Sequence, residues 1–173
     1  PAGVKYEITY DATKFVRAAI HGVIEALRDA VLLVLVVVFL FLGSFRATLI
    51  PMLAVPISLV GTFAAFLPLG FSINTLTLFA VVLAVGMVVD DAIVVVEAVQ
   101  HHIEHGLSPY DATVRAMEEV SGPVVAIALV LCAVFVPVAF MGGITGQLYR
   151  QFALTLSVAV MLSALVALSL TPA

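Results

Sequence analysis

The sequence has 173 residues, of which 64% are hydrophobic and 10% are charged, and its formal net charge is −4. Soluble domains are about half apolar and a quarter charged, so this composition excludes an ordinary soluble domain and indicates an integral membrane protein. The acidic balance provides no basic surface for nucleic acid, which we exclude as a partner. We therefore expect an all-α integral membrane fold, with membrane lipid around most of the chain.

The first 28 residues are the most polar part of the N-terminal half. Residues 4–10 alternate and are rich in β-formers, which predicts the last strand of an upstream soluble domain that ends near residue 12. Residues 13–28 place apolar side chains at helical spacing and predict an amphipathic helix on the membrane surface. Because the chain begins at Pro1 without Met and ends directly after an apolar run, we expect it to be a piece of a longer protein.

Five apolar stretches follow and predict five transmembrane helices, because a bilayer requires about 20 mostly apolar residues. They lie at about residues 30–45, 49–69, 74–99, 123–141 and 152–170. Before the fourth stretch, Ser108-Pro-Tyr-Asp111 combines an N-cap serine, a proline at the first helical position and an acid at the third. This signal predicts a further helix over 108–120 that lies along the membrane surface.

Two adjacent carboxylates, Asp90 and Asp91, lie inside the third predicted span. A single Asp at the centre of a membrane helix costs about 2.5–3.5 kcal/mol, and like charges in a medium of low dielectric resist joint ionisation. A membrane helix carries this penalty where the carboxylates have a function or partners, which favours a proton or ion relay. Gly86, one turn before Asp90, leaves room beside its carboxylate. Glu97 lies on the same face near the membrane edge, and we expect it to be interfacial rather than a relay member.

The acid pair has no cationic partner in the sequence, because no Lys, Arg or His occurs within the five predicted spans. The carboxylates are therefore either protonated at rest or paired with a cation from helices outside this sequence. A purely structural role, with both carboxyls neutral and hydrogen-bonded to hydroxyl or backbone groups, is the alternative. His101 and His105 are one turn apart, but the sequence contains no second ligand cluster, so we expect an interfacial helix end and no metal.

Several blocks of the sequence, in this order, resemble one known family. The three most specific are GMVVDDAIVVVEAV at 86–99, HGLSPYDATVRAMEEVSGP at 105–123 and VFVPVAFMGGITGQLYRQFALT at 134–155. Two more, at 42–65 and 71–86, extend the resemblance over essentially the whole chain. The chain is similar to the resistance-nodulation-division (RND) superfamily, in its hydrophobe/amphiphile efflux branch of AcrB-type multidrug pumps.

This resemblance implies transmembrane helices two to six of a twelve-helix protomer, preceded at residues 1–12 by the end of a periplasmic porter domain. It places the N-terminal side in the periplasm and the 108–120 helix on the cytoplasmic surface of the transmembrane region 29–173. Asp90 and Asp91 match the family's paired proton-relay aspartates, which work with a lysine in the second half of the same transporter.

The function that the resemblance implies is proton-coupled efflux, a drug/proton antiport of hydrophobic or amphiphilic compounds across the bacterial inner membrane. The implied partners are the remaining half of the transporter and, around a homotrimer, a periplasmic adaptor and an outer-membrane channel. The coupling proton takes the place of a cofactor.

Three other interpretations stay open at this point. A non-drug RND relative of the protein-export or lipid-sensing type would share the membrane fold, although the double Asp argues against it. An intramembrane aspartyl protease requires carboxylates from two helices, whereas both lie on one here, so we expect no enzymatic activity. Na⁺ could replace H⁺ as the coupling ion, although a Na⁺ site would require more oxygen ligands than the pair offers.

Overall fold

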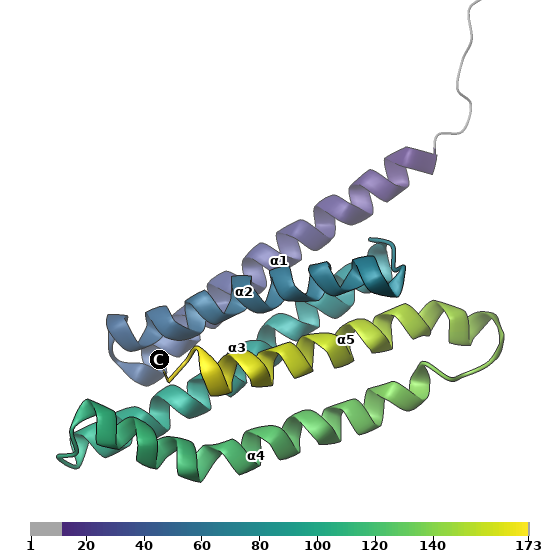
Figure 1. Cartoon of the computed structure of the whole chain (residues 1–173). Coiled ribbons are helices and arrows are strands. Elements are labelled where there is room, and N and C mark those ends of the chain that lie inside the picture. The colour runs from purple at the N-terminus through teal and green to yellow at the C-terminus, as the bar shows by residue number, and fades with distance from the viewer. Residues whose placement is uncertain (1–11, 173) are drawn as a thin grey trace, which may run out of the picture.

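The structure, a computed structural model, describes residues 12–172 as five long α-helices joined by short turns (Figure 1). The helices are α1 (Ala12–Leu42), α2 (Phe45–Leu69), α3 (Thr75–Glu104), α4 (Pro109–Val138) and α5 (Gly143–Ser169). No strand occurs within residues 12–172, which confirms the all-α class. The strand expected over 4–10 lies outside the described residues.

Helix α3 is the centre of the bundle. Among the described residues it contacts each of the other four helices, and no other helix does so. Apart from Thr77, its buried residues are alanines and valines, and Ala80 and Ala84 pack against Leu156 and Ala159 of α5. Small side chains allow membrane helices to approach closely, and this close packing holds them together. The helix that carries the acid pair is therefore the one that every other helix touches.

Within the described part of the chain, four helices are long and apolar enough to cross a bilayer: Ala47–Leu69, Thr75–Glu104, Pro109–Val138 and Gly143–Ser169. Helix α1 differs because Glu25, Arg28 and Asp29 precede an apolar part, residues 30–42, that is shorter than the usual span of about 20 residues. The expected surface helix 13–28 and the first expected span form one unbroken helix, whose N-terminal half extends away from the other helices (Figure 1). The first of the five expected spans stays a prediction.

Two helices begin with side-chain caps, and the one at Ser108 is the cap that the sequence predicts. The side chain of Asn74 accepts a hydrogen bond from the Thr77 N–H at 3.0 Å, and the Thr77 hydroxyl accepts one from the Asn74 N–H at 2.9 Å. This reciprocal pair is a capping box. At the start of α4, Ser108 Oγ accepts from the Asp111 N–H at 3.2 Å, and Pro109 occupies the first helical position. Both helices therefore begin where the local sequence satisfies their first free N–H groups.

The helix predicted over 108–120 does not end before the fourth span. Helix α4 continues from Pro109 to Val138 and passes through Pro123. A membrane helix tolerates such a proline because neighbouring groups satisfy the carbonyl that it frees. The packed face also continues across the expected break, at a spacing of four residues or a multiple of four: Ala112, Ala116, Val124 and Ala128. The position of 108–120 along a membrane surface stays a prediction.

Candidate functional site

The two carboxylates on α3 lie in two different environments, because adjacent residues of a helix differ by about 100° in direction. Asp91 faces α5, where Ser163 Oγ donates a hydrogen bond to Asp91 Oδ2 at 2.5 Å. Ser163 is only 1% exposed and Asp91 is half-buried, so this contact is partly shielded from solvent. Asp90 is exposed on another side of α3 and lines a groove. One carboxylate therefore contacts a neighbouring helix, and the other is accessible.

Ser163 is a site residue that the sequence analysis did not identify. It is one of several hydroxyl-bearing residues of the mostly apolar α5, which also include Ser157 and Ser169, and a buried hydroxyl requires a hydrogen-bond partner. Its oxygen also lies 3.4 Å from the Val88 carbonyl oxygen, but the 2.5 Å contact with Asp91 is the shorter one. The requirement of a buried hydroxyl for a partner was the signal in the sequence that could have identified Ser163. The sequence did not show which side of the fifth span meets α3.

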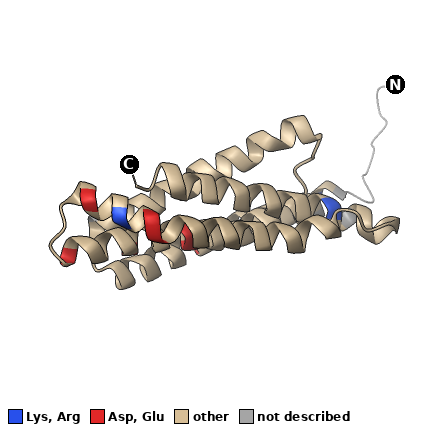
Figure 2. Ribbon diagram, turned by 60° about the horizontal axis from the view of Figure 1, so that its bottom comes forward, with Lys and Arg blue, Asp and Glu red and all other residues tan. Residues whose placement is uncertain are grey.

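Cations are not found beside the pair in residues 12–172, where none of the ion pairs includes Asp90 or Asp91. This agrees with the absence of Lys, Arg and His from the predicted spans. Figure 2 shows the same distribution, since most of the length of the helices carries neither acidic nor basic residues. The described side chains therefore provide no ion-pair partner for either carboxylate.

Gly86 lies one turn before Asp90 on α3, where the sequence analysis expected free space. A Cβ placed on Gly86 would meet no atom of a neighbouring element within 4 Å. The groove that Asp90 lines has a volume of about 850 Å³ and extends along α3 to its C-terminal end. Its walls come from α1, α3 and α4. On this chain, the groove therefore extends from Asp90 to the C-terminal end of α3.

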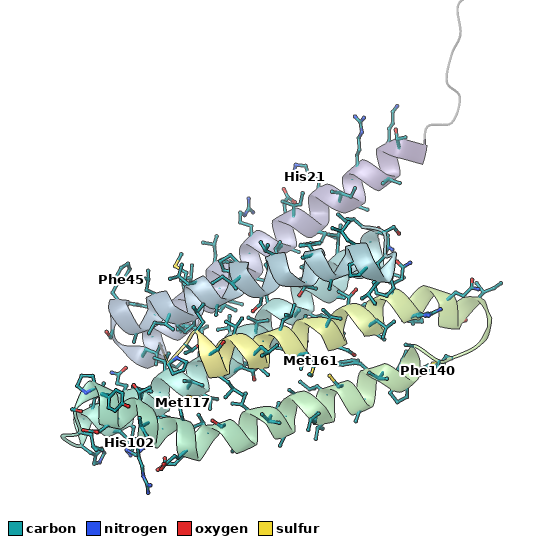
Figure 3. The ribbon with its side chains drawn as sticks, viewed as in Figure 1. His21, Phe45, His102, Met117, Phe140 and Met161 are labelled. Carbon is teal, nitrogen blue, oxygen red and sulfur yellow. The ribbon has the colours of Figure 1, made fainter. Side chains whose placement is uncertain are left out.

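His101 and His102 line the far end of this groove, near the α3–α4 turn, and Figure 3 labels His102 there. His102 Nε2 lies 3.2 Å from Glu119 Oε2 of α4. The rings of His101 and His105 are 4.3 Å apart between centroids, and His105 Nδ1 lies 2.7 Å from the His101 carbonyl oxygen. Within residues 12–172, no three His, Cys, Asp or Glu side chains form a group that could hold a metal ion. The His102–Glu119 contact holds the end of α3 against α4, whereas the His101–His105 contacts lie within the end of α3 itself.

The fold and the site define a multi-pass, α-helical membrane protein whose central helix carries two carboxylates in different environments. Residues 1–173 match the model of the AcrB/AcrD/AcrF family. The chain belongs to this family, within the RND superfamily of efflux transporters, and the resemblance inferred from the sequence blocks is confirmed.

Individual relatives support the same assignment. The chain is 53% identical over 174 residues to the multidrug export protein AcrF of Escherichia coli (strain K12). It is 55% identical to the toluene efflux pump membrane transporter TtgB of Pseudomonas putida and 51% identical to the multidrug resistance protein MdtF of Escherichia coli (strain K12). Each match covers 100% of this chain and 17% of the relative. The chain thus spans about a sixth of the length of these curated relatives.

Proposed function

We propose that this chain forms half of the transmembrane domain of a proton-driven efflux transporter in the bacterial inner membrane, with Asp90 and Asp91 as its proton relay. The transporter exports hydrophobic or amphiphilic compounds in exchange for protons. The observation that carries the proposal is the division of the pair, with Asp91 hydrogen-bonded to α5 and Asp90 open to a groove. A relay requires both features, because one group must exchange protons and another must transmit the change to a neighbouring helix.

The proposed cycle begins when a proton binds a carboxylate oxygen of the pair and removes its negative charge. The loss of charge weakens the attraction between α3 and a cation in the second half of the transporter, and the two halves shift. Loss of the proton restores the attraction. Membrane transporters commonly move in this way, with one bundle rocking against another around a fixed site.

The alternatives are less well supported. An aspartyl protease shares one proton between two carboxyls that face each other, whereas Asp91 faces Ser163 and Asp90 faces the groove. We therefore propose no enzymatic activity and no cofactor apart from the coupling proton. The relatives are named for the export of drugs or toluene, which favours a drug exporter over a protein-export or lipid-sensing relative. Few oxygen ligands surround the pair, which favours H⁺ over Na⁺.

The proposed partners follow from the length of the relatives and from the family. The missing half of the same transporter would supply the cation. The complete protomers would form a homotrimer with a periplasmic adaptor and an outer-membrane channel.

The test replaces Asp90 or Asp91 with Asn in the full-length protein. Asn nearly preserves the shape of Asp but cannot bind and release a proton in the relevant pH range. We expect both variants to lose export from proteoliposomes under an imposed pH gradient, while the amount of folded, assembled protein stays unchanged. Asp29→Asn is the matched control, because Asp29 is exposed and pairs with Arg28 at a distance from the site. Wild-type export by both Asn variants would overturn the proposal.

A further inference from the structure

One face of α3 carries titratable side chains from Asp90 to the helix end. Glu97, His101 and Glu104 follow Asp90 at intervals of seven, four and three residues, which places all four on the same side of the helix. All four line the same groove. The exposed carboxylate of the pair is therefore the first member of a polar stripe that ends at the α3–α4 turn.

The dimensions of the groove suit a chain of water molecules. Asp90 and Glu97 are about 10 Å apart along the axis of α3, whereas proton transfer requires direct hydrogen-bond contact or a bridging water. The groove volume of about 850 Å³ exceeds many times the roughly 30 Å³ that one water occupies in the liquid. A water chain can therefore connect the two carboxyl groups.

Gln100 provides a second observation that points to water in the groove. Its side-chain oxygen is buried and has no hydrogen-bond partner among the described residues, although its amide nitrogen donates to Glu104 Oε1 at 3.3 Å. Buried polar atoms in native proteins almost always have a partner, from protein or from ordered water. Because Gln100 lines the groove, a water molecule there is the natural donor.

We propose that Glu97 carries protons between Asp90 and the histidines at the end of α3, and that this groove joins the relay to the aqueous phase on that side. The inference rests on the proposed function. It also revises the sequence-based interpretation of Glu97 as merely interfacial, because Glu97 shares the groove with Asp90.

Each step conserves atoms and charge. The O–H bond of the Asp90 carboxyl breaks as an O–H bond forms on the Glu97 carboxylate through the intervening waters. The proton then passes from Glu97 to an imidazole nitrogen of His101, one turn further along α3, and from there to bulk water. The reverse order loads Asp90, and no group is oxidised or reduced.

The groups that face this route come from two helices. They are Asp90, Glu97, His101, His102 and Glu104 of α3 and Glu119 of α4. Helix α1 contributes apolar side chains to the groove, and the other member of the pair, Asp91, faces α5. Glu119 lies near both His102 and Arg115, and these contacts fix the mouth of the groove. Glu97 is the carboxylate that lies between this mouth and Asp90.

The first test is Glu97→Gln in the full-length transporter, assayed in proteoliposomes under a pH gradient with a pH-sensitive dye. We expect proton flux and export to fall at least about tenfold, in line with the loss of a group that transfers protons. Imidazole in the buffer should restore part of the rate by carrying protons in place of the missing carboxylate. Glu97→Asp should stay close to the wild type. Glu118→Gln is the control, because Glu118 is exposed, pairs with Arg115 and does not line the groove.

A second variant tests the route without changing charge. Val94 is 41% exposed and lines the groove between Asp90 and Glu97. Val94→Phe should narrow the passage and slow proton flux, whereas Val94→Ala should not. This pair decides the question if Glu97→Gln fails to fold.

The outcomes separate the two proposals. If Glu97→Gln and Val94→Phe transport at the wild-type rate while Asp90→Asn is inactive, the route is wrong and the relay stands. A slow Glu97→Gln variant that imidazole does not rescue also contradicts the carrier role. If Asp90→Asn transports normally, the proposed function itself fails.

Discussion

Ser163→Ala would remove the side-chain hydrogen bond that Asp91 receives from α5. The donor and acceptor oxygens are 2.5 Å apart, and Ser163 is 1% exposed, so water cannot readily replace the hydroxyl. Hydrogen bonds to charged groups contribute about 1.5–3 kcal/mol, whereas side-chain hydrogen bonds between membrane helices average about 0.6 kcal/mol. Because the proposed cycle requires Asp91 to carry charge in one of its states, the larger figure applies to that state. It corresponds to a change of about 10- to 150-fold in an equilibrium constant.

The assay measures export in proteoliposomes together with thermal unfolding in detergent. We expect Ser163→Ala to slow export about tenfold or more while unfolding changes little, because the smaller contribution applies when the carboxyl is neutral. Ser163→Thr keeps the hydroxyl and should retain most of the activity. Ser157→Ala on the same helix is the matched control, since Ser157 Oγ is also buried but donates to the Ala153 carbonyl oxygen at 2.9 Å.

Two results would refute this reasoning. One is wild-type export by Ser163→Ala, which would mean that the contact with α5 has no part in coupling. The other is an equal loss in Ser157→Ala, which would mean that any serine of α5 is required for packing and that the contact with Asp91 is not special.

Two further predictions concern the turns that position the bundle. A Cβ on Gly146 would lie 1.8 Å from the Met141 carbonyl oxygen, so Gly146→Ala should lower the yield of folded protein and its thermal stability by about 1–3 kcal/mol or more. Gly142→Ala, where a Cβ meets nothing within 4 Å, should leave both unchanged, and equal losses would contradict the steric argument. Asn74→Ala removes the cap of α3 and a 2.7 Å hydrogen bond to Gln151. Asn74→Ala should lower the free energy of unfolding by about 1 kcal/mol or more, measured by thermal unfolding. An unchanged midpoint temperature would show that the cap is dispensable.

The sequence was informative wherever a local rule applied. Asn74 and Ser108 cap the helices that the sequence predicted, because a capping side chain satisfies N–H groups only a few residues away. The acid pair was also visible, since two charges in an apolar span carry a large penalty. These features depend on residues close in the chain.

Contacts between helices were much harder to predict. Ser163 meets Asp91 across 72 residues of chain, and α5 is apolar on most sides, so periodicity does not show which side faces α3. The continuity of α4 was likewise hard to predict because it depends on contacts with neighbouring helices. The sequence analysis expected one helix over 108–120 and a separate span from residue 123, but the packed face of α4 continues across this boundary. In a membrane helix, packing against neighbours decides both orientation and length.

The division between Asp90 and Asp91 gives a physical reason for two adjacent acids rather than one. Under the proposed function, the half-buried Asp91, which is hydrogen-bonded to Ser163, transmits its charge state to α5. The exposed Asp90, which lines the groove, exchanges protons but makes no described hydrogen bond to another helix through which to act. The turn of about 100° between neighbouring residues separates these tasks while keeping the charges close enough to influence each other. Under the proposed function, a proton that arrives at Asp90 can therefore alter the contact that Asp91 makes with α5.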